Sequence, residues 1–266
     1  MPTFGLLGHP LSHSFSQAYF TKKFERLGLT ETHQYLNFEY KRASSFFNKR
    51  LPKFSLRAGQ EIDILRGINV TIPHKRKVTE YIDGLSPSAL EIGAVNTVLF
   101  VDGAALGFNT DHLGFTVDLK KLLDGATPQR ALVLGTGGAS RAVQYALERM
   151  NIEPLLVSRR RGPDRIRYID LDREIIESHQ LIINTTPLGT FPDVGEAPDL
   201  PYGHINETHY CYDLVYNPAQ TRFLTLSAQR GAKTQNGLGM LIGQAEAAWQ
   251  IWTNERKGRT SSRSNR

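Results

Sequence analysis

The chain has 266 residues, of which 40% are hydrophobic, and its formal net charge at pH 7 is +6. A chain of this length and apolar content can bury one large core or two modest ones, and two domains fit better. It has no apolar run long enough to cross a bilayer, and its first residues lack the basic and apolar regions of a signal peptide. We therefore expect a cytoplasmic protein with no membrane partner.

The positive charge is concentrated near the end of the chain. Residues 254–266 contain five Lys or Arg and one Glu, a net charge of +4, so the remainder carries only +2. This segment has no apolar residue, which predicts a basic disordered tail. The small charge of the remainder argues against a nucleic-acid partner. Cys211 is the single cysteine, which excludes an internal disulfide, and no His, Cys, Asp or Glu cluster has the spacing of a metal site.

The first part of the chain predicts alternating strands and helices. Ser14 has the position of an N-cap for the helix that follows it. Asp102-Gly103 separates two apolar runs and predicts a tight hairpin. The patterns predict strands at 3–7, 34–40, 67–71, 95–100 and 104–108, and further helices at 43–56 and 75–82.

The rest of the chain continues this alternation. The elements together predict an α/β protein with two domains, built on mainly parallel sheets and separated by a cleft. We expect residues 1–111, completed by a helix at about 237–253, to form the first domain, and 112–236 to form a Rossmann-like doubly wound parallel sheet. The predicted elements are helices at 113–123, 139–150 and 238–252 and strands at 131–134, 154–157, 181–184 and 210–215.

A glycine loop joins the strand at 131–134 to the helix that follows. Gly135 permits a tight turn, and Gly137, with Gly138 and Ala139 after it, lets a pyrophosphate approach the backbone at the helix N-terminus. Ser140 takes the place of the third glycine of G-x-G-x-x-G. The pattern favours dinucleotide binding, and a plain strand-to-helix turn is the alternative reading.

The residues after the next strand distinguish between dinucleotides. An NAD-binding protein would offer Asp or Glu to the ribose there, whereas this chain has Ser158, Arg159, Arg160 and Arg161. Guanidinium groups bind phosphate oxygens, so this turn predicts NADP, with Arg159 the first candidate for the 2′-phosphate. Which of the three arginines holds it stays open, and a solvated basic turn is the other interpretation.

The first domain has polar groups where its elements end. Thr71 and Lys75 lie just beyond a strand, the place where open α/β sheets bind ligands. Asn96 adds an amide and Asp111 a carboxylate, a mixture that suits a ligand rich in hydroxyls. Taken singly, Lys75 could be a surface lysine, Asn96 a turn residue and Asp111 a helix cap.

Taken together, eight stretches of the chain resemble the shikimate dehydrogenase family, and the resemblance extends to about Trp252. Eight blocks in the family's order are far more specific than any one of them. The stretches are Gly8 to Ser16, Asn69 to Lys75, Gly93 to Thr97, Asn109 to Asp111, Gly135 to Ala139, Asn184 to Gly189, Asp213 to Pro218 and Asn236 to Leu241.

The resemblance implies reversible, NADPH-dependent reduction of 3-dehydroshikimate to shikimate on the route to aromatic amino acids. It implies an N-terminal substrate domain, an NADP-binding Rossmann-like domain, and Lys75 as acid and base with Asp111 orienting it. The substrate residues that it implies are Ser14, Ser16, Thr71, Asn96, Tyr216 and Gln244. The cofactor residues are Gly135, Gly137, Gly138, Ala139, Ser158, Arg159, Arg160, Thr186, Gly189, Gly237 and Met240.

Two positions depart from the commonest family pattern. His74 stands where an aromatic residue often precedes the lysine, and Ser158 stands where asparagine often precedes the arginine. Two other functions stay open: a quinate/shikimate dehydrogenase that uses NAD, and a non-catalytic NADP-binding sensor. The sequence does not reveal whether the protein is a monomer or a homodimer.

Overall fold

The computed structural model describes residues 1–11, 14–54 and 64–262. The chain divides into two compact units. Unit 1 consists of Met1–Thr110 and Ala245–Arg266, and unit 2 of Asp111–Gln244. We had expected the last helix to join the first domain from about residue 237, whereas 237–244 lie in unit 2.

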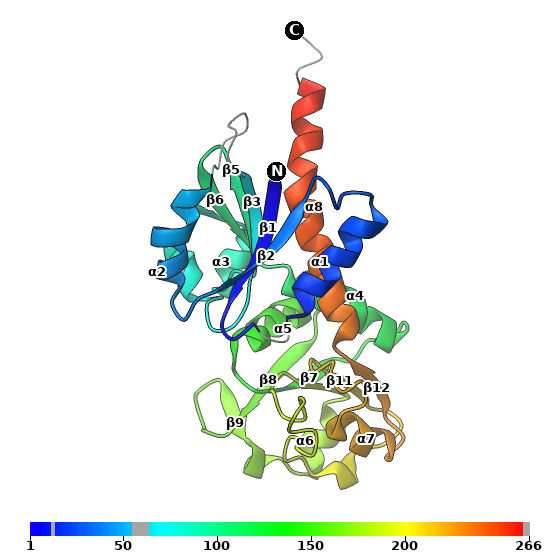
Figure 1. Ribbon diagram of the computed structural model, residues 1–266. Helices are drawn as coiled ribbons and strands as arrows, with labels where there is room; N and C mark the ends of the chain where they lie inside the picture. The colour runs from blue at the N-terminus through cyan, green and yellow to red at the C-terminus, as the bar shows by residue number, and fades with distance from the viewer. Residues whose placement is uncertain (12–13, 55–63, 263–266) are drawn as a thin grey trace. The chain divides into compact units, whose positions relative to one another are not determined.

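Unit 1 is built on a six-stranded sheet of order β2-β1-β3-β5-β6-β4 (Figure 1). β1 pairs in parallel with β2 and β3, and β5 is antiparallel to β3 and β6. Asp102 (φ 51°) and Gly103 (φ 89°) form the turn between β5 and β6, which confirms the predicted hairpin. The strands are β1 (Pro2–Gly8), β2 (Gln34–Glu39), β3 (Ile64–Val70), β4 (Gly84–Leu85), β5 (Thr97–Val101) and β6 (Ala104–Phe108).

Two helices of unit 1 differ from their predictions. The segment predicted as one helix at 43–56 is α2 (Ala43–Ser45), then a π-helical turn (Phe46–Arg50) and a 3₁₀ turn, Leu51–Lys53. Pro52 has no N–H to continue an α-helical ladder, and the predicted end at Leu56 lies outside the described residues. The helix predicted at 75–82 is only a 3₁₀ turn, Lys77–Tyr81. The remaining helices are α1 (Phe15–Arg26) and α3 (Pro87–Ile92).

Unit 2 contains a parallel six-stranded sheet of order β12-β11-β10-β7-β8-β9. When β7 is counted as the first strand, this is the order of a doubly wound dinucleotide-binding fold. The direction in which successive strands are added reverses between β7 and β10. Leu134 pairs with Asn184, Asn184 with Asp213 and Asp213 with Asn236, so four strands end in register. The strands are β7 (Arg130–Leu134), β8 (Glu153–Ser158), β9 (Arg165–Arg167), β10 (Leu181–Asn184), β11 (Tyr210–Asp213) and β12 (Lys233–Asn236).

Separate hydrophobic clusters cover the two faces of the unit 2 sheet. One contains Phe115 and Leu147, and the other contains Ile176 and Phe223. Asp111 is already the first residue of α4, two residues before the predicted start. The helices are α4 (Asp111–Leu123), α5 (Gly138–Arg149), α6 (Arg173–Ser178), α7 (Arg222–Ala228) and α8 (Leu238–Ser262).

The second half of α8 packs within unit 1. Trp252 Nε1 donates to the Val98 carbonyl (3.0 Å), and the ring lies directly over Gly67. Buried Lys23 of α1 forms an ion pair with Glu246 (2.6 Å). We predicted a disordered tail from 254, but the helix continues to Ser262, because extending a packed helix needs no new nucleus. Residues 263–266 lie outside the described residues.

Candidate functional site

The glycine loop of unit 2 leaves open space beside the start of α5. Gly135 has φ 104°, and a Cβ there would lie 2.9 Å from Thr185 Oγ1, so the position requires glycine. A Cβ on Gly137 or Gly138 would meet nothing within 4 Å. The first N–H groups of a helix have no partner inside it, so this space suits a phosphate.

Ser140 occupies the position of the third glycine. Its hydroxyl donates to the Gly135 carbonyl (2.9 Å) and accepts from Gln144 Nε2 (3.2 Å). The buried serine therefore connects the first glycine of the loop to the second turn of α5. It keeps strand and helix close without occupying the open space.

The basic turn after β8 is held by its own serine. Ser158 Oγ accepts from the Arg160 backbone N–H (3.2 Å) and donates to the Arg160 carbonyl. The hydroxyl is used within the turn, and the three arginines that follow it are exposed. Arg167, with a further contribution from Arg161, lowers the pKa of Asp170 to about 2, so Arg161 has an acidic group nearby.

The loop after β10 is ordered by side-chain hydrogen bonds. Asn184 Oδ1 accepts from both the backbone N–H (3.0 Å) and the hydroxyl of Thr186 (2.6 Å). Thr186 Oγ1 in turn accepts from the Leu188 backbone N–H (3.3 Å). Gly189 has φ 85°, a conformation that favours glycine. Thr186 and Gly189 thus belong to one constrained loop at the carboxyl edge of the sheet.

The start of α8 rests on a buried carboxylate of α4. Tyr212 donates its hydroxyl to Asp118 Oδ2 (2.8 Å) and accepts from the Met240 backbone N–H. Burial and the charge of Asp118 raise the pKa of Tyr212 well above its usual range, so the hydroxyl keeps its proton. Gly237 is pressed against Leu214, where a Cβ would lie 2.3 Å from the carbonyl oxygen. These contacts position the helix turn that contains Gly237 and Met240.

Gly239→Ala should destabilise this arrangement. A Cβ there would lie 1.9 Å from Asp118 Oδ1, so the carboxylate or the helix must move. We expect the free energy of unfolding to fall by about 1–3 kcal/mol, the usual cost of overpacking, as measured by denaturant titration. Gly203→Ala is the control, because a Cβ at Gly203 meets nothing within 4 Å. Equal stability of the two variants would contradict the prediction.

In unit 1, Ser14 and Ser16 flank the start of α1. Ser14 occupies the N-cap position, but its hydroxyl makes no cap hydrogen bond. That buried oxygen has no hydrogen-bond partner among the described residues, whereas buried polar groups normally have one. Ser16 hydrogen-bonds Tyr35, whose own hydroxyl donates to Asn69 Oδ1 (2.8 Å).

Asn96 is the centre of a second buried group in unit 1. Its Nδ2 donates to Thr110 Oγ1 (2.9 Å), and its Oδ1 accepts from the Thr110 backbone N–H (2.7 Å). Thr97 also donates to that oxygen (3.2 Å), and Asn69 Nδ2 donates to Thr97 Oγ1 (3.3 Å). The two groups therefore form one polar network from Ser16 to Thr110, the residue before Asp111.

The segment that contains Lys75 is fixed by its backbone. Val95 N–H donates to the Lys75 carbonyl (2.7 Å), which explains why no α-helix starts at this lysine. Thr71 N–H donates to the Leu7 carbonyl (2.9 Å), and buried His74 donates from Nε2 to the Tyr40 carbonyl (2.6 Å). Lys75 is half-buried, and the residue after Val95 is Asn96. The Val70 N–H also donates to the Asn96 carbonyl (2.7 Å), so the backbone places the segments of Thr71, Lys75 and Asn96 side by side.

Of the residues expected to bind substrate or transfer the proton, three lie in unit 2. Asp111 is buried at the start of α4, and Gln244 is buried with its Nε2 donating to the Leu241 carbonyl (2.9 Å). Tyr216 is exposed after β11. The pairing of Lys75 with Asp111 therefore stays a prediction.

Several buried polar residues of these networks were not among the predicted site residues. They lie in apolar surroundings, where a polar side chain needs a partner, and that contrast is the only sequence signal for them. In the described ranges, no three His, Cys, Asp or Glu side chains are grouped to hold a metal, and no helix is long and apolar enough to span a bilayer. The missed residues are Tyr35, Asn69, Thr97, Thr110, Asp118, Asn184, Tyr212 and Asp213.

Comparison with known proteins gives consistent matches. The profile of the shikimate dehydrogenase substrate binding domain matches residues 6–98. The NADP(+) shikimate dehydrogenase of Caldanaerobacter subterraneus subsp. tengcongensis is 35% identical, over 95% of this chain and 91% of the relative. The crystal structure of shikimate 5-dehydrogenase from Thermus thermophilus, in complex with NADP(H) and shikimate, is 36% identical with a TM-score of 0.79, over 96% of this chain and 94% of that one.

A further solved structure extends the comparison. Shikimate 5-dehydrogenase from Listeria monocytogenes, in complex with shikimate and NAD, is 28% identical with a TM-score of 0.80, over 96% of this chain and 92% of that one. The predicted fold class, an N-terminal α/β substrate domain plus a Rossmann-like parallel sheet, is confirmed. Because the similarity covers nearly the whole chain, this protein belongs to the shikimate dehydrogenase family.

Proposed function

We propose that the protein catalyses the reversible, NADPH-dependent reduction of 3-dehydroshikimate to shikimate on the route to aromatic amino acids. The observation that carries this proposal is the buried polar network from Ser16 to Thr110 beside the fixed Lys75 segment. A small ligand with several hydroxyls needs such a set of neighbouring donors and acceptors. We further propose that the protein acts in the cytoplasm, on small molecules alone, as a monomer or a homodimer.

The chain offers a matching site for NADP. The open space at Gly137 and Gly138 fits a pyrophosphate at the α5 N-terminus, and the exposed Arg159 and Arg160 fit a 2′-phosphate. Ser158 shapes the turn that presents them. The full proposed set is Gly135, Gly137, Gly138, Ala139, Ser158, Arg159, Arg160, Thr186, Gly189, Gly237 and Met240, of which the last four serve the nicotinamide side.

The substrate would be held chiefly by unit 1. The Ser14 hydroxyl, which has no partner among the residues that the structure describes, suits the substrate carboxylate, with Ser16 as the second hydroxyl. Thr71 and Asn96 would contact the ring hydroxyls. From unit 2 we assign Tyr216 and Gln244 to the same substrate.

Lys75 would transfer the proton. When bound, NADPH supplies the hydride that reduces the carbonyl carbon. As negative charge develops on the carbonyl oxygen, the Lys75 ammonium donates a proton to it, which lowers the barrier. In the reverse direction neutral Lys75 accepts the hydroxyl proton, and Asp111 orients both the lysine and the substrate.

A steady-state assay tests this function directly. The purified chain is assayed with shikimate or quinate, each with NADP or NAD, by following the absorbance of the reduced cofactor. The pair shikimate and NADP should have the highest kcat/KM. Absence of shikimate oxidation would refute the proposed reaction, and comparable efficiency with NAD would refute the assignment of the arginine turn.

A further inference from the structure

The carboxylate of Asp213 is a fully buried group at the end of β11. It accepts three hydrogen bonds, from Asn184 Nδ2 (3.0 Å), the Val215 backbone N–H (3.0 Å) and Thr221 Oγ1 (2.6 Å). All three donors are uncharged. They come from two different segments at the carboxyl edge of the sheet, so this one group connects both.

The carboxylate determines which way the Asn184 amide faces. An ionised carboxylate can only accept hydrogen bonds, so the amide must present its NH₂ to Asp213. The amide oxygen of Asn184 then faces the other way and accepts from the N–H and the hydroxyl of Thr186. The orientation of the loop after β10 therefore depends on the charge of Asp213.

The same carboxylate fixes the segment after β11. Val215, which it binds through the backbone, directly precedes Tyr216. A Cβ on Gly189 would lie 3.6 Å from the Thr221 Cβ, so the two segments pack together there. Phe191 N–H also donates to the Asn217 carbonyl (3.1 Å). Residues 184–191 and 213–221 thus pack as one pair of segments, and Asp213 forms hydrogen bonds with both.

We propose that Asp213 is a positioning residue, which sets the segments of Thr186, Gly189 and Tyr216 for the nicotinamide half of the cofactor and for the substrate. The inference rests on the proposed function, because that function is what assigns Thr186, Gly189 and Tyr216 to the cofactor and the substrate. Asp213 itself is fully buried, so it would act through these segments and not on a ligand directly. Its loss should weaken contacts at the nicotinamide and leave the adenosine end, held by the basic turn, unchanged.

The thermal stability of Asp213→Asn distinguishes a positioning role from a purely structural one. Burial raises the pKa of Asp213 to about 6, against opposing hydrogen bonds from Thr221, Val215 and Asn184. Between the ordinary pKa of 3.8 and about 6 the folded state then binds more protons than the unfolded state, so stability falls as pH rises. At pH 8 the ionised carboxylate is a net cost to folding. Asp213→Asn removes that charge and should not lower Tm at pH 8.

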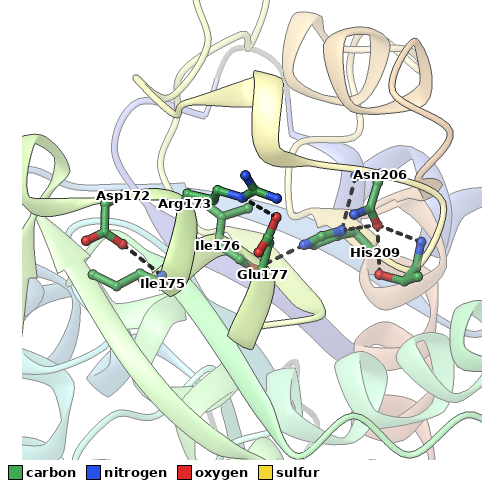
Figure 2. Close-up of polar contacts among 8 residues, drawn as sticks. Asp172, Arg173, Ile175, Ile176, Glu177, Asn206 and His209 are labelled. Carbon is green, nitrogen blue, oxygen red and sulfur yellow. Dashed lines mark hydrogen bonds and ion pairs between the residues drawn. The ribbon is translucent and has the colours of Figure 1, made fainter.

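A matched control lies at the other end of the same strand. His209 directly precedes β11 and is buried. Its Nε2 donates to the Ile176 carbonyl (3.1 Å), and its Nδ1 accepts from the Asn206 backbone N–H (3.2 Å), as Figure 2 shows. His209→Ala removes a buried polar centre of similar connectivity from the edge of the sheet opposite the glycine loop. It should lower Tm without changing the affinity for NADPH.

The experiment measures the dissociation constants of NADPH and of 2′,5′-ADP, which lacks the nicotinamide, by fluorescence titration and calorimetry. For Asp213→Asn we expect the Kd of NADPH to rise about tenfold and kcat to fall by about tenfold or more, with the Kd of 2′,5′-ADP unchanged. Thr221→Val should also raise the Kd of NADPH, because it removes one donor to Asp213. It removes the N-cap acceptor of α7 as well, so its Tm should fall while the Kd of 2′,5′-ADP stays unchanged. Thr221→Ser, which keeps the hydroxyl, should restore the affinity.

Two results would overturn the proposal. One is wild-type NADPH affinity and kcat in Asp213→Asn. The other is a parallel loss of Tm and of affinity for both ligands, the pattern of a structural residue. If Asp213→Asn does not fold, the Thr221→Val and Thr221→Ser pair decides between the same outcomes. The binding assays need no turnover, so failure of the proposed reaction would appear separately, as wild-type protein that binds NADPH without oxidising shikimate.

Discussion

Replacing Lys75 with alanine is expected to lower kcat by roughly two to four orders of magnitude, the range for loss of a positioned acid-base group. The backbone carbonyl of Lys75 is held by the Val95 N–H, and this bond does not depend on the side chain. The loop should therefore keep its place, and the affinity for NADP should change little. Steady-state kinetics in both directions, with an NADP titration, measure the two effects.

Lys77 provides the control for this variant. It lies two residues further on, is exposed, and pairs at the surface with Glu80 (2.6 Å). Such a pair contributes little to stability, so Lys77→Ala should keep wild-type kcat and Tm. Near-normal turnover in Lys75→Ala would remove this lysine from the mechanism.

Arg159→Ala should weaken NADP binding by about 1.5–3 kcal/mol, the strength of a charge-assisted hydrogen bond to phosphate. The expected change in Kd is thus roughly 10- to 150-fold. NAD has no 2′-phosphate, so its affinity should stay the same. Isothermal titration with both cofactors measures the difference, and lower ionic strength should increase it, because salt screens exposed charges.

Two other arginines sharpen the assignment. Arg161 is near the carboxylate of Asp170, whose negative charge would oppose a phosphate bound there, so Arg161→Ala should have the smaller effect. Arg173 is exposed and bonded to Glu177 (2.8 Å), as Figure 2 shows, and Arg173→Ala should leave the Kd of NADP unchanged. If Arg159→Ala binds NADP with unchanged affinity, the 2′-phosphate must be assigned to Arg160 or Arg161 instead.

Local patterns predicted the elements that are long or have turn chemistry of their own. The hairpin at Asp102-Gly103 and the strand-loop-helix unit at Gly135 depend on neighbours in sequence, and both form as expected. β9 and β12 were missed, since each has three or four mainly polar residues and exists only because a parallel neighbour pairs with it. The helix predicted from Ala43 is irregular in the structure, and apolar periodicity does not indicate an interruption such as the missing N–H of Pro52.

The sequence indicated the residues proposed to bind ligands better than it indicated the buried residues that hold them in place. The residues that we propose to bind ligands stand in recognisable motifs at strand ends, so the sequence indicated Lys75, Asn96 and the glycine loop. Residues that hold those motifs have partners far along the chain. Tyr212 and Asp118, for example, are 94 positions apart and meet through the packing of α4 on the sheet. Tertiary structure alone reveals such pairs.

The division of α8 between the two units has a consequence for biosynthesis. Unit 2 is one continuous stretch, so its core can close as soon as residue 244 has left the ribosome. The core of unit 1 cannot close that early, because Trp252 packs on Gly67 and bonds to Val98. Trp252 is translated more than 150 residues later than Val98. The nascent N-terminal half therefore keeps an unfilled apolar surface throughout elongation, and chaperones would be expected to bind there.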